Sequence, residues 1–280
     1  MSIYIKTGSA LTYLQSILSG QTTSYQKSLE QLSSGNKYTS VGDNPIEVCE
    51  SAKLQVKINS NKQASANVDI GKDMLSSTES YQNTILSNIQ RIRDLSVQAA
   101  SETYTTTDKD AILSEIKARL NFIDNTSSSA NFDGVKLMDG SSSATFLQIG
   151  SNSSAIMPIG DALIDTHANA LGIDLPGVTG ANWTTANIKT YITNLDTATD
   201  TLLAAGAKIG GYLNRLDTAS QNITKMNENL IENKSVISDT DTAKACADLV
   251  KYQILQQGSA SILTQANQAS SWALQLLNKN

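Results

Sequence analysis

The chain has 280 residues, of which 40% are hydrophobic and only 5% are aromatic, and its formal net charge is −5. A chain of this length forms one or two domains. The acidic balance lacks the basic footprint of a nucleic-acid-binding protein. No stretch approaches the ~20 apolar residues that a membrane-spanning helix needs, so we expect neither nucleic-acid binding nor membrane insertion. Few aromatics and only three prolines favour slim helices with small side chains in their contacts.

The first predicted element is a helix over residues 8–33. Apolar residues seven apart form a stripe along it, with one more leucine beside the stripe: Leu11, Leu18, Tyr25, Leu32 and Leu14. Gly35 is suited to end this helix, because a helix commonly closes on a glycine with positive φ. Pro45 is suited to the first position of a second helix, because proline is favoured there, and Asp43 or Asn44 would cap that helix.

The second helix is predicted over residues 46–100, which contain no proline. Ser101 to Thr107 form a polar break, and Asp108 is the expected cap of a third helix. That helix carries one apolar face and is expected to stop in the polar run 125–131.

The middle of the chain has a different character. Residues 132–137 and 145–149 are short, bounded by turn residues and β-prone, with the turn signal Asp139-Gly140 between them. A further strand is expected near Ile156. The rest of residues 150–184 is rich in glycine, so we expect turns and irregular surface there.

Helical periodicity returns at residues 185–233 and again at 243–277. From Leu195 onward, apolar residues recur every seven positions through the first of these and just beyond its end: Leu195, Leu202, Ile209, Leu216, Ile223, Leu230 and Ile237. A narrow stripe of this length needs partner helices. The predicted fold is therefore mainly α: a long antiparallel helical bundle or coiled-coil rod, with its two ends paired and a small β-hairpin region from the middle of the chain at the far end.

No catalytic constellation is recognisable, so we predict that the protein is not an enzyme and uses no cofactor or metal. His167, the only histidine, is expected to be a surface residue without a serine or carboxylate partner. Gly206 and Gly210 lie within a continuing heptad pattern and indicate close helix packing rather than a phosphate loop. Cys49 and Cys246 lack the spacing of a metal pair. The N-terminal residues lack the apolar region of a secretory signal peptide.

Several motifs resemble those of bacterial flagellins. At the N-terminal end these are Leu29-Glu30-Gln31-Leu32-Ser33-Ser34-Gly35, then Gln90 to Ala99, then Phe132-Asp133-Gly134-Val135-Lys136-Leu137. At the C-terminal end they are Ile254-Leu255-Gln256-Gln257, Gln265-Ala266-Asn267-Gln268 and Leu274-Gln275-Leu276-Leu277. The motifs stand in the family's order, and the resemblance covers roughly residues 1–140 and 185–278.

The resemblance implies a minimal flagellin with only the two core domains. Residues 1–43 and 234–280 would form the terminal helical domain of the inner tube. Residues 44–140 and 185–233 would form the helical-bundle spoke domain. The segment 141–184 would add a short β and loop region, which is too short for a large outer domain.

The implied function is that of a structural subunit that polymerises into the flagellar filament for motility, outside the cell. Its implied partners are copies of itself, an export chaperone, the filament cap and hook-associated proteins, after export in an unfolded state by the flagellar type III system. We also expect the terminal helices to order only on assembly. A hook–filament junction protein of the same superfamily is the alternative, because the segment 42–46 is similar to its Asp-Asp-Pro-Ile motif and the family's proline after Gln268 is missing.

Three groups of site residues follow from the resemblance. Arg91, Leu95, Glu115 and Arg119 match positions that the Toll-like flagellin receptor recognises, where their native role is packing between subunits. Six leucines of the terminal helices are expected to build the inner tube: Leu11, Leu14, Leu18, Leu255, Leu263 and Leu276. Cys49 and Cys246 would form a disulfide after export.

Overall fold

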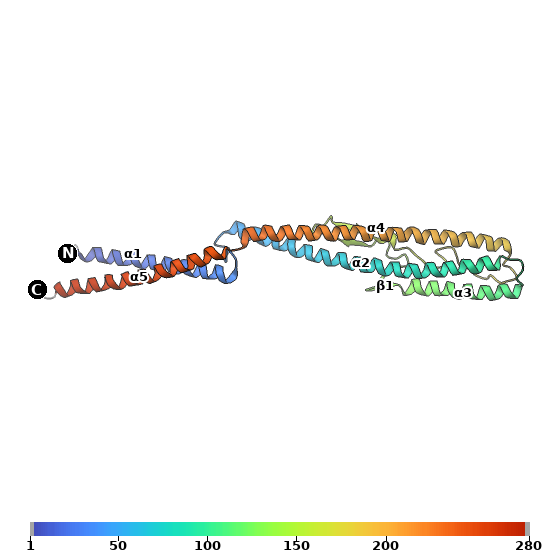
Figure 1. The fold of residues 1–280 in the computed structure, drawn as a ribbon, viewed down its shortest axis with the longest axis horizontal. Helices are drawn as coiled ribbons and strands as arrows, with labels where there is room; N and C mark the ends of the chain where they lie inside the picture. The colour runs from blue at the N-terminus through green and yellow to red at the C-terminus, as the bar shows by residue number, and fades with distance from the viewer. Residues whose placement is uncertain (1–2, 278–280) are drawn as a thin grey trace. The chain divides into compact units, whose positions relative to one another are not determined.

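The structure is a computed structural model that describes residues 3–277 of the chain, and the side chains of residues 11–268 and of Trp272. Its five long helices are α1 (Ile3–Ser34), α2 (Pro45–Ala99), α3 (Thr106–Ser129), α4 (Thr185–Ser238) and α5 (Thr242–Leu277) (Figure 1). The strands are β1 (Asn131–Phe132), β2 (Val135–Lys136), β3 (Phe146–Gln148) and β4 (Ile156–Pro158). The predicted class, mainly α with a small β-hairpin region, is confirmed.

The chain divides into two compact units. The terminal unit comprises residues 1–57 and 229–280, and the bundle unit comprises residues 58–228. Their bounds fall inside α2 and α4, whereas the sequence placed the domain bounds at the ends of predicted segments, near residues 43 and 233.

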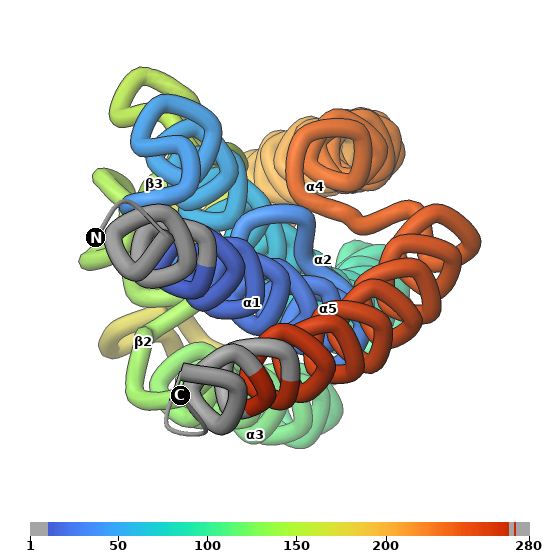
Figure 2. The backbone as a smooth tube through the Cα atoms, turned by 90° about the vertical axis from the view of Figure 1, so that its left-hand side faces the viewer, coloured from blue at the N-terminus to red at the C-terminus, as the bar shows by residue number. Residues whose placement is uncertain are grey.

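In the terminal unit, α1 and α5 lie side by side and run antiparallel (Figures 1 and 2). Polar side chains cross between them: Gln256 Nε2 donates to Thr22 Oγ1 at 3.1 Å and Ser259 Oγ donates to Gln21 Oε1 at 2.8 Å. The predicted pairing of the two chain ends is therefore confirmed. Gly35 follows α1 with φ 71°, and its N–H donates to the carbonyl of Gln31, which is the helix ending that the sequence predicts.

The helix starts follow from capping side chains. Pro45 opens α2, and Asn44 Oδ1 accepts from the N–H of Glu47 at 3.4 Å, so Asn44 is the cap. The sequence predicts Asp108 as the cap of α3, and this prediction is wrong: Asp108 is the third residue of the helix. Thr105 is the cap, and Thr105 and Asp108 bond each other's backbone N–H in a capping box.

The third helix ends at Ser129, inside the polar run 125–131 where the sequence predicts its end. Hydroxyls in its polar run bond the helix's own carbonyls, as Thr126 Oγ1 does with the carbonyl of Phe122 at 2.8 Å. Because these hydroxyls are satisfied within the helix, it continues through part of the polar run before it ends.

The core of the bundle unit lies between α2, α3 and α4, which run side by side (Figure 1). Every seventh residue of α4 is buried from Leu195 to Ile223. Beyond that point the stripe loses its cover: Leu230 is only half-buried and Met226 is exposed. The heptad pattern continues in the sequence, but it forms a closed core only where α3 and the hairpins complete the bundle.

Two hairpins replace the single β region that the sequence suggested. Asp133 and Gly134, both with positive φ, connect β1 to β2, while β3 pairs with β4 in antiparallel register from Phe146↔Pro158 to Gln148↔Ile156. The Asp139-Gly140 turn connects the hairpins instead of two paired strands.

The position of the second hairpin also differs from the expectation. Leu147 packs on Gly71 of α2 so closely that a β-carbon there would collide with one of its methyl groups. Asn67 Nδ2 donates to the carbonyl of Gln148. The hairpin thus lies along the side of α2. At the end of the bundle unit where α3 begins, the contact comes from the loop before α4 and not from this hairpin: the N–H of Gly180 donates to Asp110 Oδ1 at 2.6 Å. Of the described helices, none combines the length and apolar character needed to cross a lipid bilayer.

Candidate assembly surfaces

Three of the four residues expected at a shared contact surface meet across α2 and α3. Arg119 Nε and Nη2 each donate to Glu115 Oε1 at 3.1 Å, and Arg91 Nη2 donates to the same oxygen at 3.3 Å. The hydrogen bond from Arg119, helped by the charge of Arg91, holds the pKa of the Glu115 carboxyl below its ordinary value. This charge cluster is fixed in position but stays open to solvent.

The charge cluster borders a shallow groove between α2 and α3. Arg119 Nη1 also donates to Asn88 Oδ1 at 3.3 Å, which ties the groove's two walls. Phe122 forms the apolar part of the lining and is exposed, next to Ala118. A groove with one large apolar side chain and a charged rim can receive a side chain from another molecule.

Leu95 does not belong to this surface in the subunit. Its side chain is only 2% exposed and lies in the bundle core, on the same side of α2 as Ile92 and Ala99. The spacing of three and four residues places all three on the helix face that packs against the bundle. The expected surface group is thus reduced to Arg91, Glu115 and Arg119.

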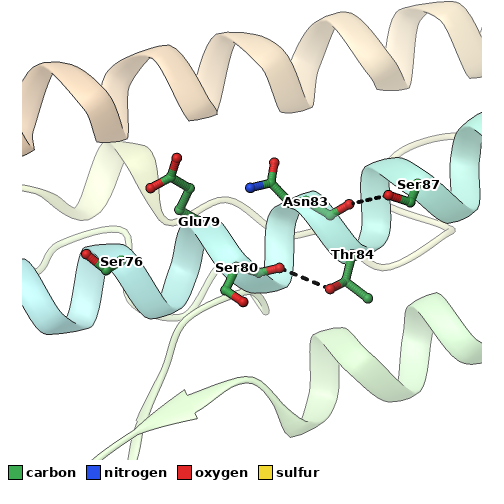
Figure 3. Close-up of a pocket in the computed structure, with 6 residues that line it drawn as sticks. All are labelled: Ser76, Glu79, Ser80, Asn83, Thr84 and Ser87. Carbon is green, nitrogen blue, oxygen red and sulfur yellow. Dashed lines mark hydrogen bonds between the residues drawn. The ribbon is translucent and has the colours of Figure 1, made fainter.

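A strip of polar side chains, most of them small, continues the exposed face of α2 (Figure 3). It consists of Ser76, Glu79, Ser80, Asn83, Thr84 and Ser87. The hydroxyls of Thr84 and Ser87 donate to the carbonyls of Ser80 and Asn83, at 3.0 and 2.9 Å. Because the hydroxyls of Thr84 and Ser87 are satisfied within the helix, a neighbouring helix can approach this part of the strip closely.

The terminal helices bury few of their apolar side chains. Leu11, Leu14, Leu18 and Leu263 are half-buried, Leu255 is exposed, and the side chain of Leu276 lies outside the described residues. Further apolar side chains of α5 are exposed: Val250, Ile254, Ile262 and Trp272. The pairing of α1 with α5 therefore leaves much of the apolar surface of α5 in water.

The hairpin β3–β4 adds an apolar surface that sequence reasoning missed. Phe146 is 65% exposed and Ile156 is also exposed, while Met157 on the opposite face is buried in the bundle core. The alternation of a strand assigns these side chains to opposite faces once the register is known. The sequence did not reveal which face would be covered.

Cys49 and Cys246 are free and exposed in the structure. The expected disulfide between them is not formed there, and it stays a prediction. Among the described residues, no group of three His, Cys, Asp or Glu side chains is placed to hold a metal ion.

His167 differs from the expected isolated surface residue. Its ring lies between Ser128 and Asp165, with Nε2 3.0 Å from Ser128 Oγ and Nδ1 2.7 Å from Asp165 Oδ1. Ser128 is 39 residues away in the chain, so no local sequence pattern could show this contact.

The chain is mainly helical, and several of its helices expose faces of polar or apolar side chains. These features are typical of proteins that assemble by packing their helices side by side. The bacterial flagellin N-terminal helical region matches residues 5–143, and the bacterial flagellin C-terminal helical region matches residues 192–277. The chain belongs to the bacterial flagellin family. It is a structural subunit of the flagellar filament and not an enzyme.

Relatives of similar length support the same assignment. The chain is 32% identical to the flagellar filament 30.7 kDa core protein of Treponema maltophilum, with 90% of this chain and 92% of that protein covered. It is 32% identical to the flagellin of Bacillus subtilis, with 93% and 95% covered. A solved structure of a putative flagellar hook-associated protein from Vibrio parahaemolyticus shares the fold, with a TM-score of 0.56, 16% identity, and 70% of this chain and 99% of that chain covered.

Proposed function

We propose that the protein is exported unfolded through the flagellar type III channel and polymerises outside the cell as a filament subunit. The observation that carries the proposal is the row of exposed apolar side chains on α5, which includes Ile254 and Ile262. Apolar surface of this extent favours a partner, at about 25 cal/mol per Å² removed from water. Further copies of the same helical pair are the partners that a filament supplies.

The terminal helices are proposed to order fully only on assembly. Among the described side chains of α1 and α5, Ser28, Ala245 and Ser259 alone are buried. Helices with so little buried apolar area gain little free energy to offset their conformational entropy. Contact with neighbouring subunits adds the missing burial, and a flexible terminal unit is suited to passage through a narrow export channel.

The charge cluster Arg91, Glu115 and Arg119 is proposed as a contact between neighbouring subunits and as a surface for the Toll-like flagellin receptor. Its support is geometric: the ion pairs hold three long side chains in one arrangement at the rim of the α2–α3 groove. The filament cap, an export chaperone and hook-associated proteins complete the proposed set of partners.

A hook–filament junction protein is the alternative function. Its motif-like segment 42–46 forms the turn into α2, where Lys27 Nζ donates to Asp43 Oδ1 at 2.6 Å. A junction protein forms a short ring and does not elongate, so the two functions differ in the length of the polymer.

Seeded polymerisation, followed by electron microscopy, tests both. Long filaments support the filament subunit, whereas rings or no growth on seeds would support the junction protein. The variant Ile254→Asp should stop elongation, because it places a charge in the apolar surface of α5. Gln253→Asp, at an exposed position about 100° around the helix from Ile254, is the matched control and should elongate normally. Elongation of Ile254→Asp at the wild-type rate contradicts the proposed role of α5.

A further inference from the structure

Three side chains form a continuous hydrogen-bonded chain at the end of α3. Ser128 Oγ lies 3.0 Å from His167 Nε2, and His167 Nδ1 lies 2.7 Å from Asp165 Oδ1. Ser128 belongs to the last turn of α3, while Asp165 and His167 belong to the segment between the second hairpin and α4. The order serine, imidazole, carboxylate is that of an activated nucleophile with its base and orienting acid.

The contacts fix the tautomer of the imidazole. The Asp165 carboxylate accepts a hydrogen bond at Nδ1, so in the neutral ring Nδ1 carries the proton and Nε2 carries the lone pair. The lone pair then faces the hydroxyl of Ser128. This is the tautomer that accepts a proton from serine.

The segment that bears His167 is held firmly against α3. The N–H of Ala168 donates to Asp124 Oδ1 at 2.8 Å, and the hydroxyls of Ser127 and Thr166, both fully buried, lie 2.7 Å apart. These bonds lie on both sides of the Ser128–His167 contact. The geometry is therefore set by the fold and not by the pair itself.

The carboxylate is oriented in the same way. The backbone N–H of His167 donates to Asp165 Oδ1 at 3.0 Å, and the side chain of Asp165 packs over Gly140, where a β-carbon would lie 3.1 Å from its own. Ser128 itself is exposed. Lys136 Nζ donates to the carbonyl oxygen of Ser128 at 2.5 Å, which brings a positive charge beside the nucleophile.

We propose that Ser128 is an acceptor site for an acyl group carried by an activated carboxylic ester or thioester. His167 Nε2 takes the hydroxyl proton as Ser128 Oγ forms a bond to the acyl carbon. The bond from that carbon to the leaving group breaks, and the leaving group departs with the electron pair and receives the proton from His167. The products are an O-acyl serine and the free alcohol or thiol. This site does not depend on the polymer and lies beyond the structural role proposed above.

The same surroundings make the acyl group stay on the protein. Ser128 lies at the C-terminal end of α3, where the helix presents backbone carbonyls and the negative end of its dipole. This end does not stabilise an oxyanion that forms at Ser128. An activated ester reacts despite this because its leaving group is good. A serine alkoxide is a poor leaving group, so attack by water on the acyl serine is slow. Ser128 is thus a site of modification, in agreement with a structural protein, and not a site of turnover.

Reaction of the full-length protein with p-nitrophenyl acetate at neutral pH tests the proposal. We expect one equivalent of p-nitrophenol per subunit in the fast phase, with the acetyl group located on Ser128 by peptide mass spectrometry. Ser128→Ala should lose the fast phase. His167→Gln and Asp165→Asn should slow it on the order of 100-fold, the lower end of the range for a general base.

Ser141→Ala is the matched control. Ser141 is also exposed, and its hydroxyl donates to the Asp139 carboxylate at 2.6 Å, so its loss should leave the fast phase unchanged. Thermal unfolding of each variant separates the base role from support of the fold. Asp165→Asn keeps the shape of the side chain and serves as the decisive variant if His167→Gln is destabilised.

The proposal is overturned by either of two results. One is acetyl spread over many serines and lysines without preference for Ser128. The other is a folded Asp165→Asn or His167→Gln protein that is acetylated at Ser128 as fast as the wild type, because the imidazole would then have no part in the reaction.

Discussion

The buried amide of Asn61 is a weak point in the pairing of α2 with α4. Its side chain is only 1% exposed, and within the described part of the chain neither Oδ1 nor Nδ2 has a hydrogen-bond partner. The ion pair between Lys72 and Asp217 marks an antiparallel register in which Asn61 falls near the turn of α4 that holds Asn227. The Oδ1 of Asn227 is also buried without a hydrogen-bond partner among the described residues. Such amides act against stability but oppose a shifted register of the two helices.

Asn61→Leu is therefore expected to raise the free energy of unfolding by about 1 kcal/mol or more, because it removes an unsatisfied polar group and keeps the same branched arrangement of side-chain heavy atoms. Urea denaturation of the monomer measures the change. Asn83→Leu on the exposed face of α2 is the control and should change stability by less than about 0.5 kcal/mol. A loss of stability in Asn61→Leu would mean that the amide has a bonded partner after all, such as a buried water.

Asp161 anchors the segment between β4 and the Asp165–His167 loop to α4. Tyr212 Oη donates to its Oδ1 at 2.5 Å, and Lys208 lies 3.5 Å from Oδ2. The hydrogen bond from Tyr212, with the charge of Lys208, lowers the pKa of the Asp161 carboxyl. A lowered folded-state pKa stabilises the fold above the unfolded-state value near 3.8, and this contribution is lost as the pH falls through the folded-state pKa.

Asp161→Asn should thus be less stable than the wild type at neutral pH, and the difference should shrink below about pH 4. Since the carboxylate is about half exposed, solvent screening keeps the effect small. Chemical denaturation at several pH values measures it. A difference that grows on acidification contradicts the assigned ionic role of Asp161.

At the scale of the elements, two glycines differ in the space around their α-carbons. A β-carbon on Gly160 would collide with the backbone carbonyl of Ser143, which cannot swing away. A β-carbon on Gly210, in the middle of α4, would meet no atom within 4 Å. The close helix packing expected from the spacing of Gly206 and Gly210 is therefore wrong at Gly210.

Gly160→Ala is expected to destabilise the bundle unit by about 1–3 kcal/mol, the usual cost of overpacking. Gly210→Ala should stabilise it by up to about 1 kcal/mol, because alanine favours the helix and the site has room. Thermal unfolding of the two variants side by side is the measurement. Loss of stability in Gly210→Ala would show that another molecule or helix occupies the space beside α4.

The sequence predicts the helices well because each carries its own signals. Gly35, Pro45 and the seven-residue stripe of α4 depend only on local backbone preference and periodicity. The structure differs where the deciding contact is distant in the chain. Leu95 is buried because three helices meet around it, and His167 gains its partners because the end of α3 folds back beside the loop that bears it. No local pattern contains either contact.

At the scale of the whole molecule, the buried apolar core lies within one of the two units. All residues of the main core cluster fall between Ala64 and Ile223, inside the bundle unit. The described side chains of α1 and α5 bury few of their own apolar groups. Stability and assembly are therefore expected to reside in different parts of the chain.

A fragment of residues 58–228 tests this separation. It retains the whole core, so it should unfold cooperatively at a midpoint within a few degrees of the full-length protein, which corresponds to about 1 kcal/mol or less. It lacks α1 and α5, so it should fail to elongate filament seeds. Calorimetry and seeded electron microscopy provide the two readouts.

A fragment that is unfolded would show that the terminal unit contributes to the stability of the bundle. A fragment that elongates seeds would show that the contacts of the bundle unit suffice for polymerisation. Either result would require the division between a stable bundle and assembling ends to be abandoned.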